Sequence, residues 1–332
     1  MQKKAAFYLT RPVGSRYFKR MTQRFTDFNG ETAKDMKRLF TPRSAESPAR
    51  TVILMSGNGT NAEAVLKYSL EHRCAFRVTV LATDAPRTSR ARELGELYGL
   101  PVVELDLREF YRERGEDSIR LDSPRRRALR QEWSDTLYSL LAPYAPEMGI
   151  LAGFIPLTNL TGRFPCLNVH PGDLTVEDAS GRRVLAGLHI LPVERAISEE
   201  HGVLRSSVIL AQPYTGDGSA EMDSGPVLGV SAAMPLDLEG ASAAELAAER
   251  AARIPGRVPD DRLRKLARRN VERLKSVGDH VVLPRAADDF AAGRFYAEGK
   301  RLGFLSEDGN LHIARTVEYR ADGSRVFLES TR

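Results

Sequence analysis

The chain has 332 residues, of which 42% are hydrophobic, and a formal net charge of +5. This length and composition allow a full hydrophobic core in one large domain or two smaller ones. No stretch approaches the ~20 apolar residues of a membrane span, and the opening MQKKAAFYLT lacks the apolar region of a secretory signal. We therefore expect a soluble, cytoplasmic protein with no membrane partner.

The positive charge belongs to the N-terminal part of the chain. Residues 1–50 contain twelve Lys and Arg against four Asp and Glu, so the remaining residues carry a net charge of −3. We interpret residues 1–48 as a basic N-terminal extension, solvated or packed on the main domain. A nucleic-acid partner is not expected, although aromatic residues among the basic ones leave that possibility open.

Apolar runs alternate with helical patterns from residue 51 onward. The strands are continuously hydrophobic, which is typical of a parallel sheet covered by helices on both faces. The sequence therefore predicts an α/β fold, with a doubly wound, mostly parallel sheet. The predicted strands are 51–55, 76–83, 101–105, 148–152 and 165–170, and the predicted helices are 60–72, 87–99 and 123–143.

The second half of the chain changes character at residue 236. Before it, apolar runs at 203–211 and 226–235 predict further strands of the same sheet. After it, the patterns predict helices within 241–254 and 259–277, followed from residue 303 by a short β-meander that turns at residues 321–323. We assign residues 236–332 to a C-terminal helical segment and β-meander packed on the core.

A glycine-rich loop, SGNGTN at residues 56–61, joins the first predicted strand to the first helix. Two interpretations are open. Gly57, Gly59 and Ala62 satisfy the relaxed dinucleotide fingerprint, with Asp84 as the acid that would bind the ribose. Alternatively, the polar side chains that follow Gly59 suit a single phosphate, held by backbone N–H groups at a helix N-terminus.

The stretch LNVHPGDL, residues 167–174, carries the stronger signal. Asn168 and His170 are two residues apart at a strand end, so their side chains leave on the same side. An amide donor beside an imidazole can stabilise an oxyanion and move a proton, as acyl transfer requires. By itself such a pair is more often structural. Asp223, within EMDSGPVL, precedes another strand and can reach the same strand-end site.

These motifs together resemble the formyltransferase fold, and most closely the folate-dependent glycinamide ribonucleotide formyltransferases of purine synthesis. The resemblance runs almost continuously from about residue 51 to 230, and it makes residues 49–235 the catalytic domain. It rests on SGNGTNAEAV (56–65), YAPEMGILAGF (144–154), LNVHPGDL (167–174), GLH (187–189), EEHG (199–202), MDSGPVL (222–228) and DHVVLPRAADDFAAGRF (279–295).

The resemblance implies a role for each matching position, and 10-formyltetrahydrofolate as the co-substrate. The catalytic trio would be Asn168, His170 and Asp223. The 5′-phosphate of the amine substrate would bind to Gly57, Asn58, Gly59, Thr60 and Asn61, and its sugar to Asp279. The folate pocket would be lined by Phe154, Ile155, Pro156, Leu157, Gly218 and Glu221. No metal or nicotinamide is implied, and Cys74 and Cys166 are expected to be reduced thiols. We expect small-molecule substrates and a monomer or homodimer.

Several departures from the family pattern leave the acceptor open. Ile155-Pro156 replaces a Met-Arg pair, Leu191 and Ile209 replace histidines, and a charged insertion follows Leu174. A divergent formyltransferase for another amine, a formyltetrahydrofolate hydrolase and a non-catalytic folate- or nucleotide-binding protein remain as alternatives. Transfer to methionyl-tRNA is disfavoured because the C-terminal barrel of that branch is not evident.

Overall fold

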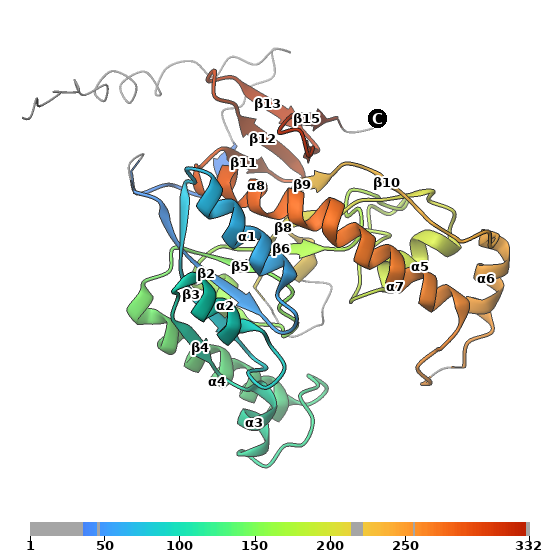
Figure 1. The fold of residues 1–332 in the computed structure, drawn as a ribbon, viewed down its shortest axis with the longest axis horizontal. Helices are drawn as coiled ribbons and strands as arrows, with labels where there is room; N and C mark the ends of the chain where they lie inside the picture. Colours follow the sequence, from blue (N-terminus) through green and yellow to red (C-terminus); the bar gives the residue numbers. More distant parts are fainter. Residues whose placement is uncertain (1–35, 45–46, 214–221, 255, 330–332) are drawn as a thin grey trace, which may run out of the picture.

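The structure is a computed structural model that describes residues 36–44, 47–213, 222–254 and 256–329 (Figure 1). Most of the predicted N-terminal extension therefore lies outside the described residues. Its residues Lys37–Arg38 form β1, which pairs with β11 (Phe295–Glu298). Within the described ranges, none of the helices combines the length and apolar character needed to cross a membrane.

A nine-stranded mixed sheet forms the centre of the molecule. Its order is β15-β14-β9-β8-β6-β5-β2-β3-β4, and the run from β6 to β4 is parallel. Strand β8 runs antiparallel to both of its neighbours, and β14 is parallel to β9. The fold prediction of a largely parallel α/β sheet is thus confirmed. The bounds are β2 Ala49–Met55, β3 Phe76–Thr83, β4 Val102–Glu104, β5 Met148–Leu151, β6 Cys166–His170, β8 Ser207–Ala211, β9 Val227–Ser231, β14 Thr316–Tyr319 and β15 Arg325–Leu328.

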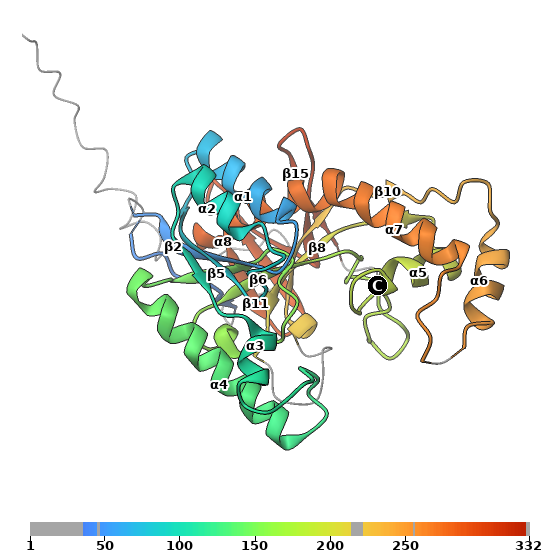
Figure 2. The same ribbon diagram turned by 60° about the horizontal axis from the view of Figure 1, so that its bottom comes forward.

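Helices cover both faces of this sheet (Figures 1 and 2). Helices α1 (Thr60–Glu71), α2 (Ala91–Tyr98) and α8 (His280–Ala291) pack on one face, and α3 (Leu107–Arg112) and α4 (Pro124–Leu141) pack on the other. Strand β2 shows why both faces are apolar. Its residues Val52 and Leu54 contact the α3/α4 layer, whereas Ile53 and Met55 contact the α1/α8 layer, since successive side chains of a strand point to opposite faces.

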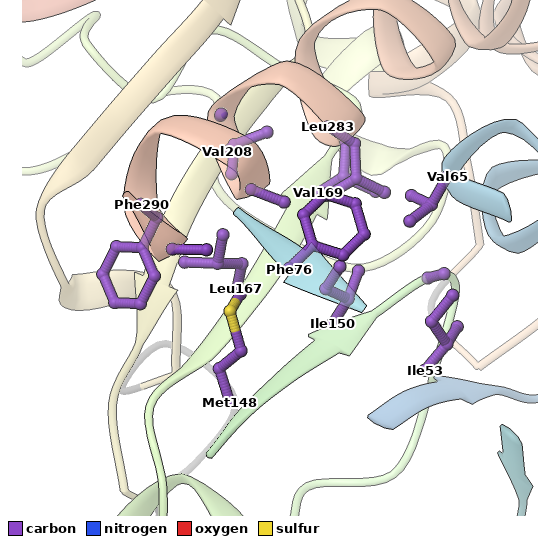
Figure 3. Close-up of a cluster of buried hydrophobic side chains, with 14 of the residues drawn as sticks. Ile53, Val65, Phe76, Met148, Ile150, Leu167, Val169, Val208, Leu283 and Phe290 are labelled. Carbon is purple, nitrogen blue, oxygen red and sulfur yellow. The ribbon is translucent and has the colours of Figure 1, made fainter. Parts of the chain in front are cut away.

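The core under α1 and α8 brings together segments far apart in the chain. Figure 3 shows Val65 of α1 and Leu283 and Phe290 of α8 against Ile150 and Leu167 of the sheet. All five side chains are fully buried. Burying each such side chain contributes about 1.5–3 kcal/mol. The C-terminal helix α8 is therefore part of the central core and holds the sheet against α1.

A second cluster of helices lies to one side of the sheet (Figure 2). It consists of α5 (Leu191–Ser198), α6 (Ala243–Ala251) and α7 (Arg262–Leu274), with the short strands β7 (Val203–Leu204) and β10 (Met234–Pro235). A π-helical turn, Lys275–Asp279, continues α7 directly into α8. Short 3-10 helices form at Ala142–Tyr144, Asn159–Gly162 and Met222–Ser224 (η3, η4 and η5).

The C-terminal strands are shared between two sheets. The meander predicted from residue 303 is present and turns after Tyr319, but only β14 and β15 extend the central sheet. Strands β12 (Arg301–Leu305) and β13 (Leu311–Ala314) instead form an antiparallel sheet with β1 and β11.

The other boundaries that differ from prediction have local causes. Helix α2 starts at Ala91 and not at residue 87, because the intervening residues form a turn in which the amides of Thr88 and Ser89 both bond to Ala85. The two apolar runs predicted as single strands are each split in two, which separates β7 from β8 and β9 from β10.

Candidate active site

A cavity of about 350 Å³ opens at the carboxyl ends of the parallel strands, where ligands bind in sheets of this type. Residues after β5, at the end of β6 and in the π-turn contribute to its wall. Its polar and apolar side chains come from segments far apart in the sequence. They include Asn61, Phe154, Ile155, Leu157, Asn168, His170, His189, Asp223, Glu272, Lys275 and Asp279.

Asn168, His170 and Asp223 lie together on this wall. Asn168 and His170 leave β6 on the same side, as their spacing predicts, and Asp223 comes from the 3-10 helix that precedes β9. The Asn168 amide donates to Asp223 Oδ1 at 3.3 Å, and His170 Nδ1 lies 3.6 Å from Asp223 Oδ2. The second distance is too long for a hydrogen bond but short enough for an ion pair. The carboxylate is thus shared by an amide and an imidazole.

The other ring nitrogen of His170 has a separate partner. Nε2 lies 2.7 Å from the backbone oxygen of Leu185, in a part of the ring that is buried. A carbonyl oxygen can only accept, so Nε2 carries the proton that makes this bond. Nδ1, on the Asp223 side, is therefore the nitrogen that remains for chemistry in the cavity. In the protonated ring both nitrogens donate, and each already faces an acceptor.

The Asp223 carboxyl is largely shielded from water, with 14% of its side chain exposed. Burial raises its pKa above the usual value of 3.8, and the charge of His170, the Asn168 hydrogen bond and the charge of Arg183 oppose that rise. Such opposed influences on a carboxyl beside a histidine are typical of groups that exchange protons.

Asp279 and Asn61 form a second polar group in the same cavity. The Asn61 amide donates to Asp279 Oδ2 at 2.8 Å, and the Ser206 hydroxyl donates to Oδ1 at 2.5 Å. Burial raises the pKa of the Asp279 carboxyl, while both hydrogen bonds lower it. Among the described residues, none bonds to the side-chain oxygen of Asn61, which is buried. Through its amide, Asn61 links the glycine-rich loop to Asp279.

The π-turn depends on a glycine beside Asp279. A Cβ on Gly278 would lie 2.5 Å from Ser206 Oγ, 3.0 Å from Leu274 Cδ1 and 3.1 Å from Ser231 Oγ. Only glycine therefore lets the turn approach β8 and β9 this closely. We expect Gly278→Ala to lower the free energy of unfolding by about 1–3 kcal/mol, because overpacking outweighs the ~1 kcal/mol that alanine usually contributes to a helix.

Urea unfolding of Gly278→Ala beside Gly162→Ala tests this expectation. Gly162 lies in η4, and an added Cβ there would meet nothing closer than Pro213 Cγ at 3.9 Å. An unfolding midpoint that falls only for Gly278→Ala supports the close approach. Equal midpoints for the two variants would show that the turn accommodates a side chain.

The glycine-rich loop lies beside the cavity more than in it. Of the five residues expected to bind phosphate, Asn61 lines the cavity, whereas Gly57, Asn58, Gly59 and Thr60 do not. Gly59 begins α1 with φ of 66° and no side-chain cap. Arg90 braces the loop, since its backbone N–H and its guanidinium donate to the carbonyls of Gly57 and Asn58.

A second cavity adjoins the first, and the four described residues of the expected folate pocket line one or both of them. Phe154 lines the first cavity and Pro156 lines the second, of about 630 Å³, while Ile155 and Leu157 line both. Gly218 and Glu221 lie outside the described residues. Asp84, the acid of the dinucleotide interpretation, lines the second cavity and accepts a hydrogen bond from Ser56 at 2.5 Å.

Sequence reasoning missed several groups around the first cavity. Lys275, which pairs with Glu272 at 2.6 Å, and the Leu185 carbonyl become neighbours of the site only through the tertiary fold. His189, by contrast, belongs to the GLH motif of the sequence resemblance, and its left-handed backbone (φ 55°) is unusual for a residue other than glycine and typical of strained functional sites. Gly278 was the one residue that the sequence could have marked as part of the site, since a glycine within a helical pattern often marks close packing.

Within the described ranges, no three His, Cys, Asp or Glu side chains are grouped so as to hold a metal ion.

The similarity of this chain to known proteins lies in its structure. No family model matches the chain, and no curated protein matches its sequence. Glycinamide ribonucleotide transformylase 1 from Symbiobacterium toebii aligns with a TM-score of 0.52 at 23% identity, over 78% of this chain and 95% of that one. Phosphoribosylglycinamide formyltransferase from Coxiella burnetii aligns with a TM-score of 0.50 at 19% identity, over 80% of this chain and 96% of that one. The chain therefore has the fold of the glycinamide ribonucleotide formyltransferases, as the sequence resemblance implies.

Proposed function

We propose that the protein transfers the formyl group of 10-formyltetrahydrofolate to the primary amine of a phosphorylated substrate, and that this substrate is glycinamide ribonucleotide. The observation that carries the proposal is the grouping of Asn168, His170 and Asp223 on one wall of a cavity that also contains Asn61 and Asp279. In support, two of the solved structures to which the chain is similar are named as a glycinamide ribonucleotide transformylase and a phosphoribosylglycinamide formyltransferase.

The geometry suits attack of an amine on a formyl carbon. As the amine adds, negative charge develops on the formyl oxygen. The Asn168 amide has two N–H donors and uses one of them on Asp223, so the other can bind that oxygen. Protonated His170 can donate from Nδ1, and each such donor lowers the barrier by about 3 kcal/mol. Asp223 can then accept the proton that the attacking amine loses, and the tetrahydrofolate nitrogen leaves with a proton from the site.

The acceptor would extend from the first turn of α1 toward His170. The uncapped N-terminus of α1 offers free backbone N–H groups and the positive end of a helix dipole, which suit a phosphate. Asn61, in the first turn of α1, and Asp279 line the same cavity as the trio, and amide and carboxylate groups can bond to sugar hydroxyls. This sequence of contacts favours an amine that carries both a sugar and a phosphate.

The donor would lie along the wall that the two cavities share. Ile155 and Leu157 border both cavities, so a long ligand can contact each of them. The second cavity combines apolar side chains with arginines, among them Arg108 and Arg120, which are exposed and have no ion-pair partner in the described part of the chain. Apolar walls suit an aromatic ring, and free guanidinium groups suit the carboxylates of the glutamate that folates carry.

An amine-dependence assay tests the proposal. The protein is incubated with 10-formyltetrahydrofolate, with and without glycinamide ribonucleotide, and the release of tetrahydrofolate is followed by absorbance. We expect release only when the ribonucleotide is present. Equal release without any amine would instead identify a hydrolase. Donor binding without turnover, with the ribonucleotide and with a panel of other phosphorylated amines, would identify a binding protein.

A further inference from the structure

The charged insertion after Leu174 is an ordered segment beside the cavity. Asp178 closes a turn by accepting hydrogen bonds from the backbone of Ser180 and Arg182, and Glu177 forms a β-bridge with Arg183. Glu177 also pairs with Lys300 at 3.1 Å and with Arg315 at 3.6 Å. Residues 175–186, called the inserted segment below, are thus joined by ion pairs to the connections between the C-terminal strands. Two groups of this segment contact the active-site trio.

The first contact orients His170. The Leu185 backbone oxygen is the partner of His170 Nε2 at 2.7 Å, and the Leu185 side chain is buried. Gly172 makes room for this approach, because a Cβ at that position would lie 2.7 Å from Leu185 O and 3.1 Å from His170 Nε2. The inserted segment therefore sets which ring nitrogen faces Asp223.

The second contact fixes the backbone of Asp223. The two terminal nitrogens of Arg183 donate separately, one to the Asp223 carbonyl and the other to the Gly225 carbonyl at 2.6 Å. Gly225 lies close against β8, where only glycine fits, because a Cβ there would lie 1.9 Å from Leu210 O. A planar guanidinium can bind two carbonyls at once, and an ammonium group cannot reproduce that geometry.

We propose that the inserted segment is a positioning element of the active site and that Arg183 is its positioning residue, holding Asp223 beside His170; this rests on the proposed formyl transfer. Neither Arg183 nor Leu185 was predicted to belong to the site. The segment contacts both members of the His170–Asp223 pair through one short stretch of chain.

The charge of Arg183 also affects the pKa of Asp223, which can be measured. Two charged groups act on the Asp223 carboxyl, His170 and Arg183, and both lower its pKa against the effect of burial. Lys275, Glu272 and Asp279 line the same cavity. The charges of Asp223, Glu177 and Arg315 in turn act on the Arg183 guanidinium. Removal of the Arg183 charge should therefore raise the pKa of Asp223, and the acid limb of the pH–rate profile should move to higher pH.

Three variants separate the charge from the geometry. Arg183→Met should lower kcat by about tenfold to a hundredfold with KM changed less than twofold, and should move the acid limb to higher pH. Arg183→Lys retains the charge but not the two-carbonyl contact, so its acid limb should stay near that of the parent while kcat remains low. Arg182→Met is the matched control, because Arg182 is exposed and adjacent in sequence, and among the described residues its guanidinium pairs only with Asp178 and Ser180. It should behave as the parent.

A direct titration of the Asp223 carboxyl tests the role of Arg183 even if the protein transfers no formyl group. The full chain is labelled with ¹³C at aspartate carboxyls, and Asp223→Asn identifies the Asp223 signal. A higher apparent pKa of Asp223 in Arg183→Met than in Arg182→Met supports the proposal. An unchanged Asp223 titration in Arg183→Met overturns it, as does a rise in KM at constant kcat in an active enzyme. If Arg183→Met fails to fold, the neutral variant Arg183→Gln takes its place in the same titration with the same two outcomes, and in an active enzyme a parent-like kcat of Arg183→Lys also overturns the proposal.

Discussion

Replacement of His170 by alanine is expected to lower kcat by about 10³-fold, with a much smaller change in the KM for either substrate. His170 Nδ1 faces Asp223 and the cavity, so the imidazole is placed both to bind the developing oxyanion and to move a proton. One oxyanion donor contributes about 10²–10³ in rate, and a positioned acid or base about 10²–10⁴. Steady-state kinetics at saturating donor and acceptor measure the effect.

His72→Ala is the matched control for this variant. His72 follows the end of α1, is exposed and stacks on Tyr68, and it does not line the cavity. Its kcat should equal that of the parent. Because His170 is buried, the melting temperature of His170→Ala must also be recorded. A folded His170→Ala protein with a kcat within threefold of the parent would contradict a catalytic role.

Replacement of Asp223 by asparagine is expected to change activity and stability in opposite directions. Activity should fall by about 10²-fold or more, because asparagine cannot accept the proton from the amine. Folding raises the pKa of Asp223, so its contribution to stability is greatest when it is protonated and declines as pH rises from the unfolded pKa through the folded one. At neutral pH the neutral asparagine should therefore leave the melting temperature unchanged or raise it.

The pH dependence of the parent enzyme belongs to the same prediction. If ionised Asp223 is required, kcat should decline as pH falls through its raised pKa, at a higher pH than the usual aspartate value of 3.8 would give. Profiles of kcat against pH and thermal unfolding of Asp223→Asn at pH 7 supply the two measurements. A stable Asp223→Asn variant that keeps both the rate and the acid limb would show that Asp223 takes no part in catalysis.

The sequence predicted the parallel half of the sheet well because its signals are local. Strands β2, β3, β5 and β6 are short hydrophobic runs bounded by glycine, proline or polar residues, and β2 ends at the glycine loop that begins α1. Side chains buried on both faces leave a continuous apolar run that needs no partner to be recognised. Helix α4 likewise has local end signals, with Ser123 as its N-cap and Pro124 in its first turn.

The strand pairings at the other edge of the sheet could not be predicted from local sequence. β1 pairs with β11 some 260 residues away, and β14 joins the central sheet beside β9. Neither pairing leaves a trace in the hydrophobic pattern of a short window. Helix α8 also has Pro284 within it, a residue that usually ends a helical pattern.

The candidate site likewise has one part that the sequence predicted and one part that it did not. Asn168 and His170 could be paired from their two-residue spacing on one strand, and the structure brings them together with Asp223. The contact of Asn61 with Asp279 joins α1 to the π-turn, and the contacts of Arg183 and Leu185 cross from an insertion to β6 and η5. Such contacts arise from packing between distant elements, so only a three-dimensional structure reveals them.

The central claim is that the formyl group passes from the folate to the amine within one cavity. The most direct measurement is a single-turnover reaction with donor labelled at the formyl carbon and an excess of glycinamide ribonucleotide, quenched and analysed by mass spectrometry. We predict that the label appears in the formamide of the ribonucleotide, and that it fails to do so with His170→Ala. Label recovered as free formate, or retained in the donor, would contradict the account.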